Sequence, residues 1–216
     1  MTSASSTAPH TVLVHGLGRS RFDMFLLKPR LEKLIPSTSV HVFDYQSRKL
    51  TIREIAKQLA TFTDHYTRGA PVSFVGHSLG GLIVRALDKE HLCSSSLHRL
   101  VTLGTPHNGA SIARFLVQFG LSHKVFGPVL REIGTFDGSF PPNSLQVGCI
   151  LGGTKTRVGF YPFAGQDNDG IVLASEALLA QAVDSITIPV LHALMPFSSS
   201  AATLSASFLT RGSFYR

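Results

Sequence analysis

The sequence predicts an α/β fold, a mainly parallel sheet of about six strands with helices on both faces. Short apolar runs rich in β-branched residues alternate with longer segments of helical spacing along the 216 residues. Such alternation implies a parallel sheet that is covered on both faces. Each motif of glycine and polar residues directly follows an apolar run, which is where functional sites lie in sheets of this kind.

Six apolar runs are the expected strands, at residues 11–14, 40–43, 71–75, 99–103, 145–151 and 186–191. Apolar residues at helical spacing predict helices over 22–34, 52–67, 79–92, 171–183 and 201–209. Residues 110–140 are less regular and leave room for only a minimal or small cap. We expect residues 1–9 to be a disordered tail and residues 10–216 to form a single domain, which suits a chain of this length.

The composition is typical of a compact globular protein, with 44% hydrophobic residues, 15% charged residues and a net charge of +7. The basic residues near the first helix, among them Arg19, Arg21 and Lys28, form no nucleic-acid-binding motif, so no nucleic-acid partner is expected. We interpret them as a solvated helix face in preference to a patch for an anionic surface. Weak contact with a membrane surface stays open as an alternative.

The first nine residues lack the basic start and the apolar run of a signal peptide, which predicts a cytoplasmic protein. Two cysteines, Cys93 and Cys149, do not make a disulfide framework and agree with a reducing compartment. Residues 185–210 carry no fixed charge, and a segment of this length could span a membrane. Because Pro189 and Pro196 interrupt it among many hydroxyl side chains, no transmembrane span is expected.

Residues 76–80 (Gly-His-Ser-Leu-Gly) join a predicted strand to a predicted helix and fit the pattern G-x-S-x-G. This pattern places a serine on a strained turn, where small neighbours let the backbone approach closely. The turn lifts the hydroxyl clear of the sheet, and the N-terminus of the helix favours developing negative charge. Ser78 is therefore the candidate nucleophile, and the alternative is that it only caps the helix.

A serine is a poor nucleophile near neutral pH unless an adjacent imidazole takes its proton and a carboxylate orients that imidazole. After a serine on this kind of turn, the acid follows in the chain and the histidine comes last. Beyond residue 123 the sequence contains one histidine, His192, which lies just after the sixth predicted strand. We expect His192 to be the general base.

The acid is expected in the loop after the fifth predicted strand, where residues 166–170 are Gln-Asp-Asn-Asp-Gly. Asp169 is favoured because Gly170 follows it and fixes a tight turn at the start of a predicted helix. A role for Asp169 as a simple N-cap is the alternative. Asp167 is the main rival and Asp137 a distant one.

Two backbone N–H groups are expected to bind the oxyanion, from Leu79 after the nucleophile and from Leu17 after the first strand. His15 and His77 flank these donors; we expect structural hydrogen bonds from both and count both among the candidate pocket residues. His107 is expected either to line the substrate pocket or only to fix its own loop.

Phe115 and Phe119 belong to an apolar stretch that predicts a hydrophobic acyl pocket or a small lid, with ordinary helix packing as the alternative. The sequence contains no metal-binding motif, no phosphate-binding loop and no dinucleotide fingerprint. No metal and no cofactor are therefore expected.

From His10 onward the sequence resembles the bacterial lipase- and esterase-like α/β-hydrolases, a group related to the GPI-inositol deacylases. The matching motifs are residues 12–20, 75–82, 103–109 and 169–172, together with His192 and the C-terminal segment 208–214. The resemblance implies the α/β-hydrolase fold and a serine hydrolase that cleaves carboxylic esters. It also implies a catalytic triad of Ser78, Asp169 and His192, and oxyanion donors at the amides of Leu17 and Leu79.

The leading hypothesis is a carboxylesterase or lipase that forms an acyl-enzyme with a small-molecule ester of hydrophobic acyl group. An acyl-thioesterase or an acyltransferase that uses the same triad is the alternative. A non-catalytic binding module on the same scaffold is a third hypothesis. The sequence leaves the length of the acyl chain, the physiological substrate and the oligomeric state open.

Overall fold

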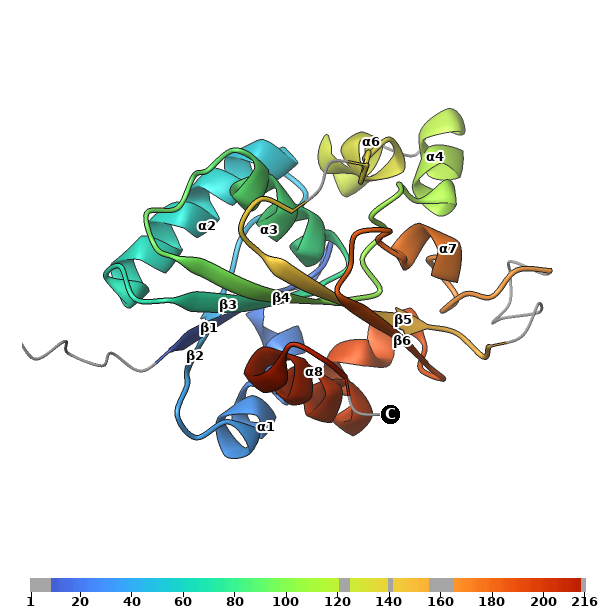
Figure 1. Ribbon diagram of the computed structural model, residues 1–216. Helices are drawn as coiled ribbons and strands as arrows, with labels where there is room; N and C mark the ends of the chain where they lie inside the picture. Colours follow the sequence, from blue (N-terminus) through green and yellow to red (C-terminus); the bar gives the residue numbers. More distant parts are fainter. Residues whose placement is uncertain (1–8, 121–124, 140–141, 156–164, 215–216) are drawn as a thin grey trace, which may run out of the picture.

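The computed structural model describes residues 9–120, 125–139, 142–155 and 165–214, shown as a ribbon in Figure 1. Most of the predicted tail, residues 1–8, lies outside this part of the chain. The described residues form a six-stranded sheet in the order β2-β1-β3-β4-β5-β6, and every neighbouring pair is parallel. The strands are β1 (His10–Val14), β2 (Ser39–Phe43), β3 (Val72–His77), β4 (Leu97–Leu103), β5 (Gln146–Gly152) and β6 (Asp184–Ile188). The predicted α/β-hydrolase fold is confirmed.

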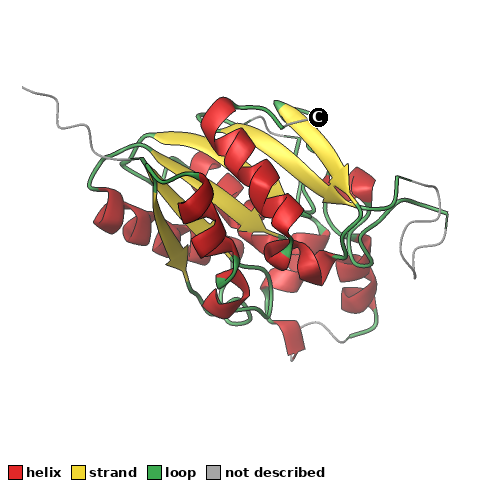
Figure 2. Cartoon of the chain, turned by 90° about the horizontal axis from the view of Figure 1, so that it is seen from below, coloured by secondary structure: helices red, strands yellow, loops and turns green. Residues whose placement is uncertain are grey.

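Helices cover both faces of this sheet. On one face lie α2 (Ile52–Thr67) and α3 (Leu79–Lys89), which pack against each other. On the other face α1 (Leu27–Leu34) and α8 (Ser199–Arg211) lie side by side, as Figure 2 shows from below. Two shorter helices, α4 (Ser111–Gln118) and α6 (Val129–Gly134), pack together as a small cap beyond the end of β4 (Figure 1).

The alternation of side chains along the strands explains why the sheet is buried on both faces. In β1, Val12 and Val14 join the core under α2 and α3, while Leu13 joins the core under α1 and α8. In β3, Phe74 and Val75 divide between the two cores in the same way. Successive side chains of a strand point to opposite faces, so a continuous apolar run is what a doubly covered strand requires.

The predicted helix over 171–183 is wrong. The structure has only a short helix there, α7 (Ala174–Ala177), because an antiparallel bridge between Asn168 and Leu173 closes residues 168–173 into a turn. The N–H of Asp169 donates to the Val172 carbonyl within this turn. The predicted helix over 22–34 is divided as well, into a 3₁₀ turn η1 (Arg21–Met24) and α1.

The end of the chain differs from its prediction in one respect that matters for the site. The sixth strand ends at Ile188, before Pro189, and His192 begins a 3₁₀ turn, η2 (His192–Phe197). A proline has no N–H group for the sheet, which explains where the strand stops. Within the described ranges no helix is long and apolar enough to cross a membrane.

Candidate active site

Ser78 occupies a strained turn between β3 and α3. Its backbone has φ 53° and ψ −120°, a conformation that costs a residue with a side chain about 1–3 kcal/mol. The turn is held by the Ser78 N–H, which donates to the Leu103 carbonyl at 2.9 Å, and by the Thr105 hydroxyl, which donates to the Ser78 carbonyl at 2.9 Å. The strain therefore persists because neighbouring strands determine the turn.

Glycines on both sides of Ser78 are required by the close approach of backbone. A Cβ atom on Gly76 would lie 2.5 Å from the Gly81 nitrogen, and one on Gly80 would lie 2.2 Å from the Val14 carbonyl oxygen. Neither obstacle is a side chain that could move aside. The same packing sets Ser78 at the N-terminus of α3, where unpaired amides and the helix dipole favour a negative charge.

His192 and Asp169 form a buried pair at the carboxyl ends of β5 and β6. The Nδ1 atom of His192 lies 2.7 Å from Oδ2 of Asp169, and both side chains are almost fully buried. The other oxygen, Oδ1, accepts the N–H groups of Ile171 and Val172 at 3.0 and 2.7 Å. The backbone N–H of His192 also donates to the Asp169 carbonyl, at 2.9 Å, so side chain and main chain both join the two loops. The carboxylate of Asp169 thus binds His192 and caps a turn, while the alternative, the N-cap of a helix over 171–183, is not found because α7 begins only at Ala174.

The two rival acids lie elsewhere. Asp167 accepts the backbone N–H groups of Thr154 and Lys155 at 2.8 and 3.0 Å, which fixes the loop after β5. Asp137 is exposed and caps its own turn through Ser139. Of the three candidates, Asp169 is the one that the structure joins to His192.

The loop after β1 lies directly against the Ser78 turn. A Cβ atom on Gly16 would be 3.2 Å from Cβ of Ser78. Leu17 follows this contact and lines the same pocket as Ser78, while Leu79 provides the first residue of α3. The two residues expected to donate to the oxyanion thus lie on separate loops beside Ser78.

His15 supports that loop from below. It is fully buried, its Nδ1–H donates to the Gly16 carbonyl at 2.9 Å, and its Nε2 lies 3.2 Å from Oδ1 of Asp44. Tyr45 stacks on the ring at 4.2 Å between centroids and donates its hydroxyl to the His15 carbonyl at 2.6 Å. Burial lowers the pKa of His15 below 6.5 in spite of Asp44. These contacts agree with a structural role.

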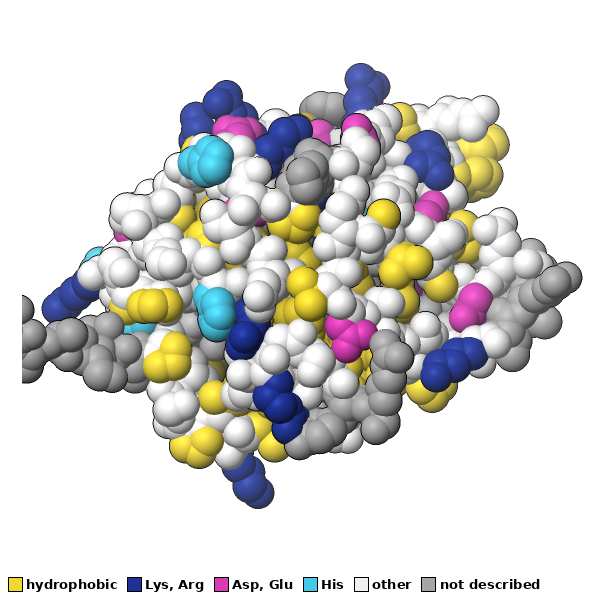
Figure 3. Space-filling view, in the orientation of Figure 1, with side chains coloured by type: hydrophobic (Ala, Val, Ile, Leu, Met, Phe, Trp, Pro, Cys, Tyr) yellow, Lys and Arg dark blue, Asp and Glu magenta, His cyan; other side chains and the backbone are white. Residues whose placement is uncertain are grey.

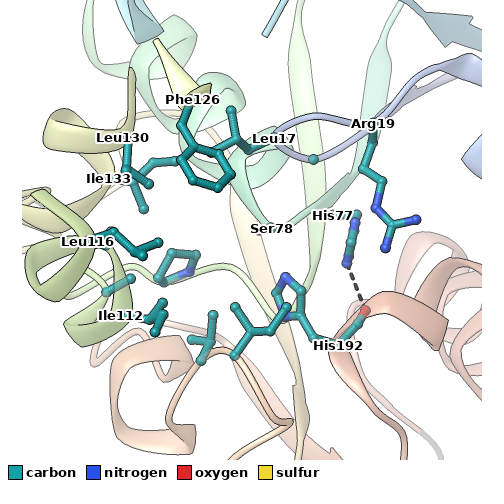
Figure 4. Close-up of a pocket in the computed structure, with 16 residues that line it drawn as sticks. Leu17, Arg19, His77, Ser78, Ile112, Leu116, Phe126, Leu130, Ile133 and His192 are labelled. Atoms are coloured by element: carbon teal, nitrogen blue, oxygen red, sulfur yellow. Dashed lines mark hydrogen bonds between the residues drawn. The ribbon is translucent and has the colours of Figure 1, made fainter. Parts of the chain in front are cut away.

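His77 contacts the pair from the other side. Burial lowers its pKa well below 6.5, so the ring is neutral and its Nε2–H donates to the His192 carbonyl at 3.0 Å. The two rings lie 4.8 Å apart between centroids. The dashed line in Figure 4 marks this bond, which holds the start of η2 in place.

Ser78 lies on the floor of a pocket of about 270 Å³ with two different walls. In Figure 4, hydrophobic side chains stand on one side of Ser78, and Arg19 and His77 stand on the other. The hydrophobic wall comes largely from the cap and comprises Ile112, Leu116, Phe126, Leu130 and Ile133. Ligand pockets are typically apolar with a few placed polar groups, which is the composition found here.

Of the candidates for this pocket, His77 lines it, whereas His15, His107, Phe115 and Phe119 do not. Phe115 and Phe119 are 53% and 62% exposed on the outer face of α4, where hydrophobic side chains gather at the upper right of Figure 3. The wall uses Ile112 and Leu116 of the same helix instead, because helical rotation turns Phe115 and Phe119 outward. His107 is buried, and its Nδ1 lies 3.4 Å from the guanidinium of Arg85. It fixes its loop and does not line the pocket.

Several of these features were missed from the sequence. The buried Arg85–His107 contact joins residues on separate elements, and together with burial it lowers the pKa of His107 to about 3. Arg19 was assigned to a solvated face, although its position two residues after Leu17 places it near the oxyanion loop. The closeness of Arg19 to Leu17 in the sequence is the signal that could have predicted its place in the pocket wall.

The buried carboxylate of Glu176 joins the cap to the loop that carries Asp169. Glu176 accepts the backbone N–H of Ser111, at the start of α4, at 2.6 Å, and that of Leu173 at 3.1 Å. Arg114 adds an ion pair with Glu176 at 3.4 Å. The hydrophobic wall is therefore anchored to the same loop that carries Asp169.

A family model described as palmitoyl protein thioesterase matches residues 10–135, which is more than half of the chain. The chain belongs to the palmitoyl protein thioesterase family. This match includes β1, the Ser78 turn and the cap up to α6, but it ends before Asp169 and His192. The candidate acid and base of this family member therefore depend on the geometry described above.

Solved structures show the same fold over nearly the whole chain. The lipase BlEst2 of Bacillus licheniformis, in its mature form, has a TM-score of 0.74 at 18% identity and covers 95% of this chain and 92% of its own. The RedJ thioesterase of the prodiginine pathway of Streptomyces coelicolor has a TM-score of 0.60 at 16% identity and covers 95% of this chain and 86% of its own. The NocB thioesterase domain of the nocardicin cluster has a TM-score of 0.52 at 20% identity and covers 95% of this chain and 93% of its own.

A search of curated protein sequences gives no match. The palmitoyl protein thioesterase match and the structural neighbours support a hydrolase of the lipase, esterase or thioesterase type. They do not show the closer likeness to the GPI-inositol deacylase group.

Proposed function

We propose that this protein hydrolyses fatty-acyl thioesters through an acyl-enzyme on Ser78, with His192 as general base and Asp169 as its partner. The observation that carries the proposal is the meeting of a strained Ser78, the buried His192–Asp169 pair and an apolar wall in one pocket. Family membership favours a thioester over an oxygen ester as the substrate.

In the first half of the reaction the Ser78 oxygen attacks the acyl carbonyl, and its proton passes to Nε2 of His192. Asp169 accepts the Nδ1–H of His192 at 2.7 Å, which fixes the tautomer that leaves Nε2 free to take a proton. The negative carbonyl oxygen is stabilised by the N–H groups of Leu17 and Leu79. The intermediate then collapses, the carbon–sulfur bond breaks, and His192 returns the proton to the departing sulfur.

In the second half, water replaces the thiol. His192 takes a proton from water as it attacks the acyl carbon, and the Ser78 oxygen leaves and recovers that proton. The products are a free acid and a thiol, and no oxidant or cofactor is consumed. The strained conformation of Ser78 keeps its oxygen in the pocket throughout, so catalysis needs no large movement of the turn.

The experiment that tests this proposal combines covalent labelling with turnover. Wild-type protein should form a fluorophosphonate adduct on Ser78, located by mass spectrometry, and should cleave hexanoyl-N-acetylcysteamine. Ser78→Ala should lose both, and His192→Ala should lose most of both, on the order of 10³-fold or more.

A matched serine variant separates chemistry from folding. Ser73→Ala removes a hydroxyl from the same strand, away from the pocket, and should leave labelling and turnover near wild type. Hydrolysis that survives Ser78→Ala in purified protein would contradict the acyl-enzyme. A preference for the matching oxygen ester, ethyl hexanoate, over the thioester would keep the acyl-enzyme but exclude the thioester assignment.

A further inference from the structure

The pocket around Ser78 is polarised, and this polarity assigns its two ends to different parts of a substrate. The cap wall is apolar and suits the acyl chain. The opposite side carries Arg19, and Figure 4 shows its guanidinium beside His77, across Ser78 from the cap. An acyl group that lies against the cap therefore directs its leaving group toward Arg19.

Beyond Arg19 the surface opens into a second hollow of about 340 Å³. Arg19 lines both hollows, so they share a wall. The second hollow is formed by the loops after β1 and β2 and is lined by Gly18, Arg19, Tyr45, Gln46, Ser47, Arg48 and Lys49. Three of these seven residues are cationic and none is acidic.

Arg48 is held close to the expected oxyanion loop. A Cβ atom on Gly18 would lie 2.9 Å from the Nη2 atom of Arg48, and the Gly18 N–H donates to the Ser47 hydroxyl at 2.9 Å. The guanidinium thus lies against the residue that follows Leu17. Among the residues that the structure describes, Arg48 and Lys49 make no ion pair with a carboxylate, while Arg19 is paired with Asp23 at 2.8 Å.

We propose that this second hollow binds a phosphate group on the leaving thiol or alcohol of the substrate. The inference rests on the proposed function, because it names the part of the substrate that departs from the acyl-enzyme. A phosphate carries up to two negative charges and several acceptor oxygens, which suits the guanidinium of Arg48 and the ammonium of Lys49, since Arg19 is already paired with Asp23. A single peptide carboxylate would leave part of that charge unmatched.

The chemistry is that of a phosphate ester, which a phosphorylated thiol carrier or a phospholipid headgroup can supply. Two matched pairs of substrates separate these sources. Hexanoyl-coenzyme A is compared with hexanoyl-N-acetylcysteamine, which has the same acyl group on a neutral thiol. Dihexanoylphosphatidic acid is compared with dihexanoylglycerol, which lacks the phosphate.

We expect kcat/KM for hexanoyl-coenzyme A to exceed that for the neutral thioester at low salt, and to fall when the ionic strength is raised. Arg48→Gln and Lys49→Gln should each lower kcat/KM for the phosphate-bearing substrate by about fivefold, the size of one exposed charge-assisted contact. In both variants the loss should be clearly larger for the phosphate-bearing substrate than for the neutral thioester. Lys57→Gln, an exposed lysine on α2, is the matched control and should change neither. The same pattern confined to the lipid pair would assign the phosphate to a headgroup.

The inference would be overturned if phosphate-bearing and neutral substrates were cleaved equally in both pairs. It would also be overturned if a hexanoylated cysteine peptide rich in Asp and Glu were preferred to hexanoyl-coenzyme A. If no substrate were cleaved and Ser78 took no fluorophosphonate, the proposed function itself would fail, and the inference with it. The neutral thioester thus distinguishes the two failures.

Discussion

Around Ser78 the position of almost every backbone atom is determined by close contact, whereas the acyl wall depends on side chains of two short helices. Next to Ser78, neither Gly76 nor Gly80 can carry a Cβ atom, because backbone atoms lie 2.5 and 2.2 Å from the positions that those Cβ atoms would take. On the cap side, α4 presents Ile112 and Leu116 to the pocket and leaves Phe115 exposed. If the proposed function holds, the contrast teaches that central strands position the reacting groups, whereas a peripheral segment determines which acyl chains fit.

The largest effect should come from the acid. Asp169→Asn should lower kcat by about 10⁴-fold, because an amide can present its NH₂ to His192 and favour the wrong tautomer. The neighbouring change Asp167→Asn is the control and should stay within a fewfold of wild type, since Asp167 only caps the loop after β5. Turnover of a thioester by both purified variants measures this. Equal losses in both would mean that the acid has been assigned to the wrong residue.

A methyl group in the Ser78 turn should affect stability next. Gly80→Ala should lower the free energy of unfolding by about 3 kcal/mol, because the new carbon would meet the Val14 carbonyl. Urea unfolding measures this change. Gly69→Ala is the control, at a site of φ +86° with open space, where only backbone strain of about 1 kcal/mol is expected. If Gly80→Ala were as stable as wild type, the tight contact between β1 and the turn would be refuted.

Changes in the hydrophobic wall should alter which acyl chains are accepted rather than the rate of the chemical step. Leu116→Trp should shorten the acyl chain that the pocket accepts and lower kcat/KM for decanoyl thioesters by about 10- to 100-fold relative to acetyl thioesters. Phe115→Trp, one residue away on the outer face of α4, should leave this ratio unchanged. Rates across a series of acyl lengths test the difference. An unchanged length profile in Leu116→Trp would place the acyl chain elsewhere.

Stability should also depend on pH, because buried histidines lie on the side of the molecule that carries Ser78. Burial lowers the pKa of His15 and His77, and burial with Arg85 lowers that of His107 to about 3. In the unfolded chain these rings take up protons below about pH 6.5, whereas the folded protein keeps them neutral. Stability should therefore be full above pH 6.5 and fall by about 1.4 kcal/mol per pH unit for each such histidine, down to its folded pKa.

Urea unfolding at pH 7 and pH 5 measures that slope. His107→Gln should reduce the slope of stability against pH, because glutamine takes up no proton in either state, while His15 and His77 still contribute to it. The control His98→Gln changes a ring on the exposed part of β4 and should alter the slope less. Equal stability of the wild-type protein at pH 7 and pH 5 would contradict the interpretation of the buried rings as neutral.

The parts of the site that the sequence predicted are those with a local cause. The Ser78 turn follows from small residues at fixed spacing, and the order of Ser78, Asp169 and His192 follows from the order of the strands. The helix over 171–183 failed because its apolar periodicity says nothing of the bridge between Asn168 and Leu173, which closes the start of the segment into a turn. The periodicity of α4 likewise could not tell which of two apolar faces would meet the pocket. The sequence did not show that Arg19, whose side chain is 35% exposed, also lines the pocket, since a pocket wall depends on loops from separate strands.

The carboxylate of Glu176 accepts backbone N–H groups from Ser111, at the start of α4, and from Leu173, in the loop that carries Asp169. The cap is therefore attached to the rest of the domain at a defined contact, and it can be exchanged as a unit. An engineer who exchanges residues 112–130 for another insert can expect the hydrolytic centre to survive if Ser111 and Glu176 are retained. Conversely, a change at this contact would disturb both substrate choice and the orientation of Asp169.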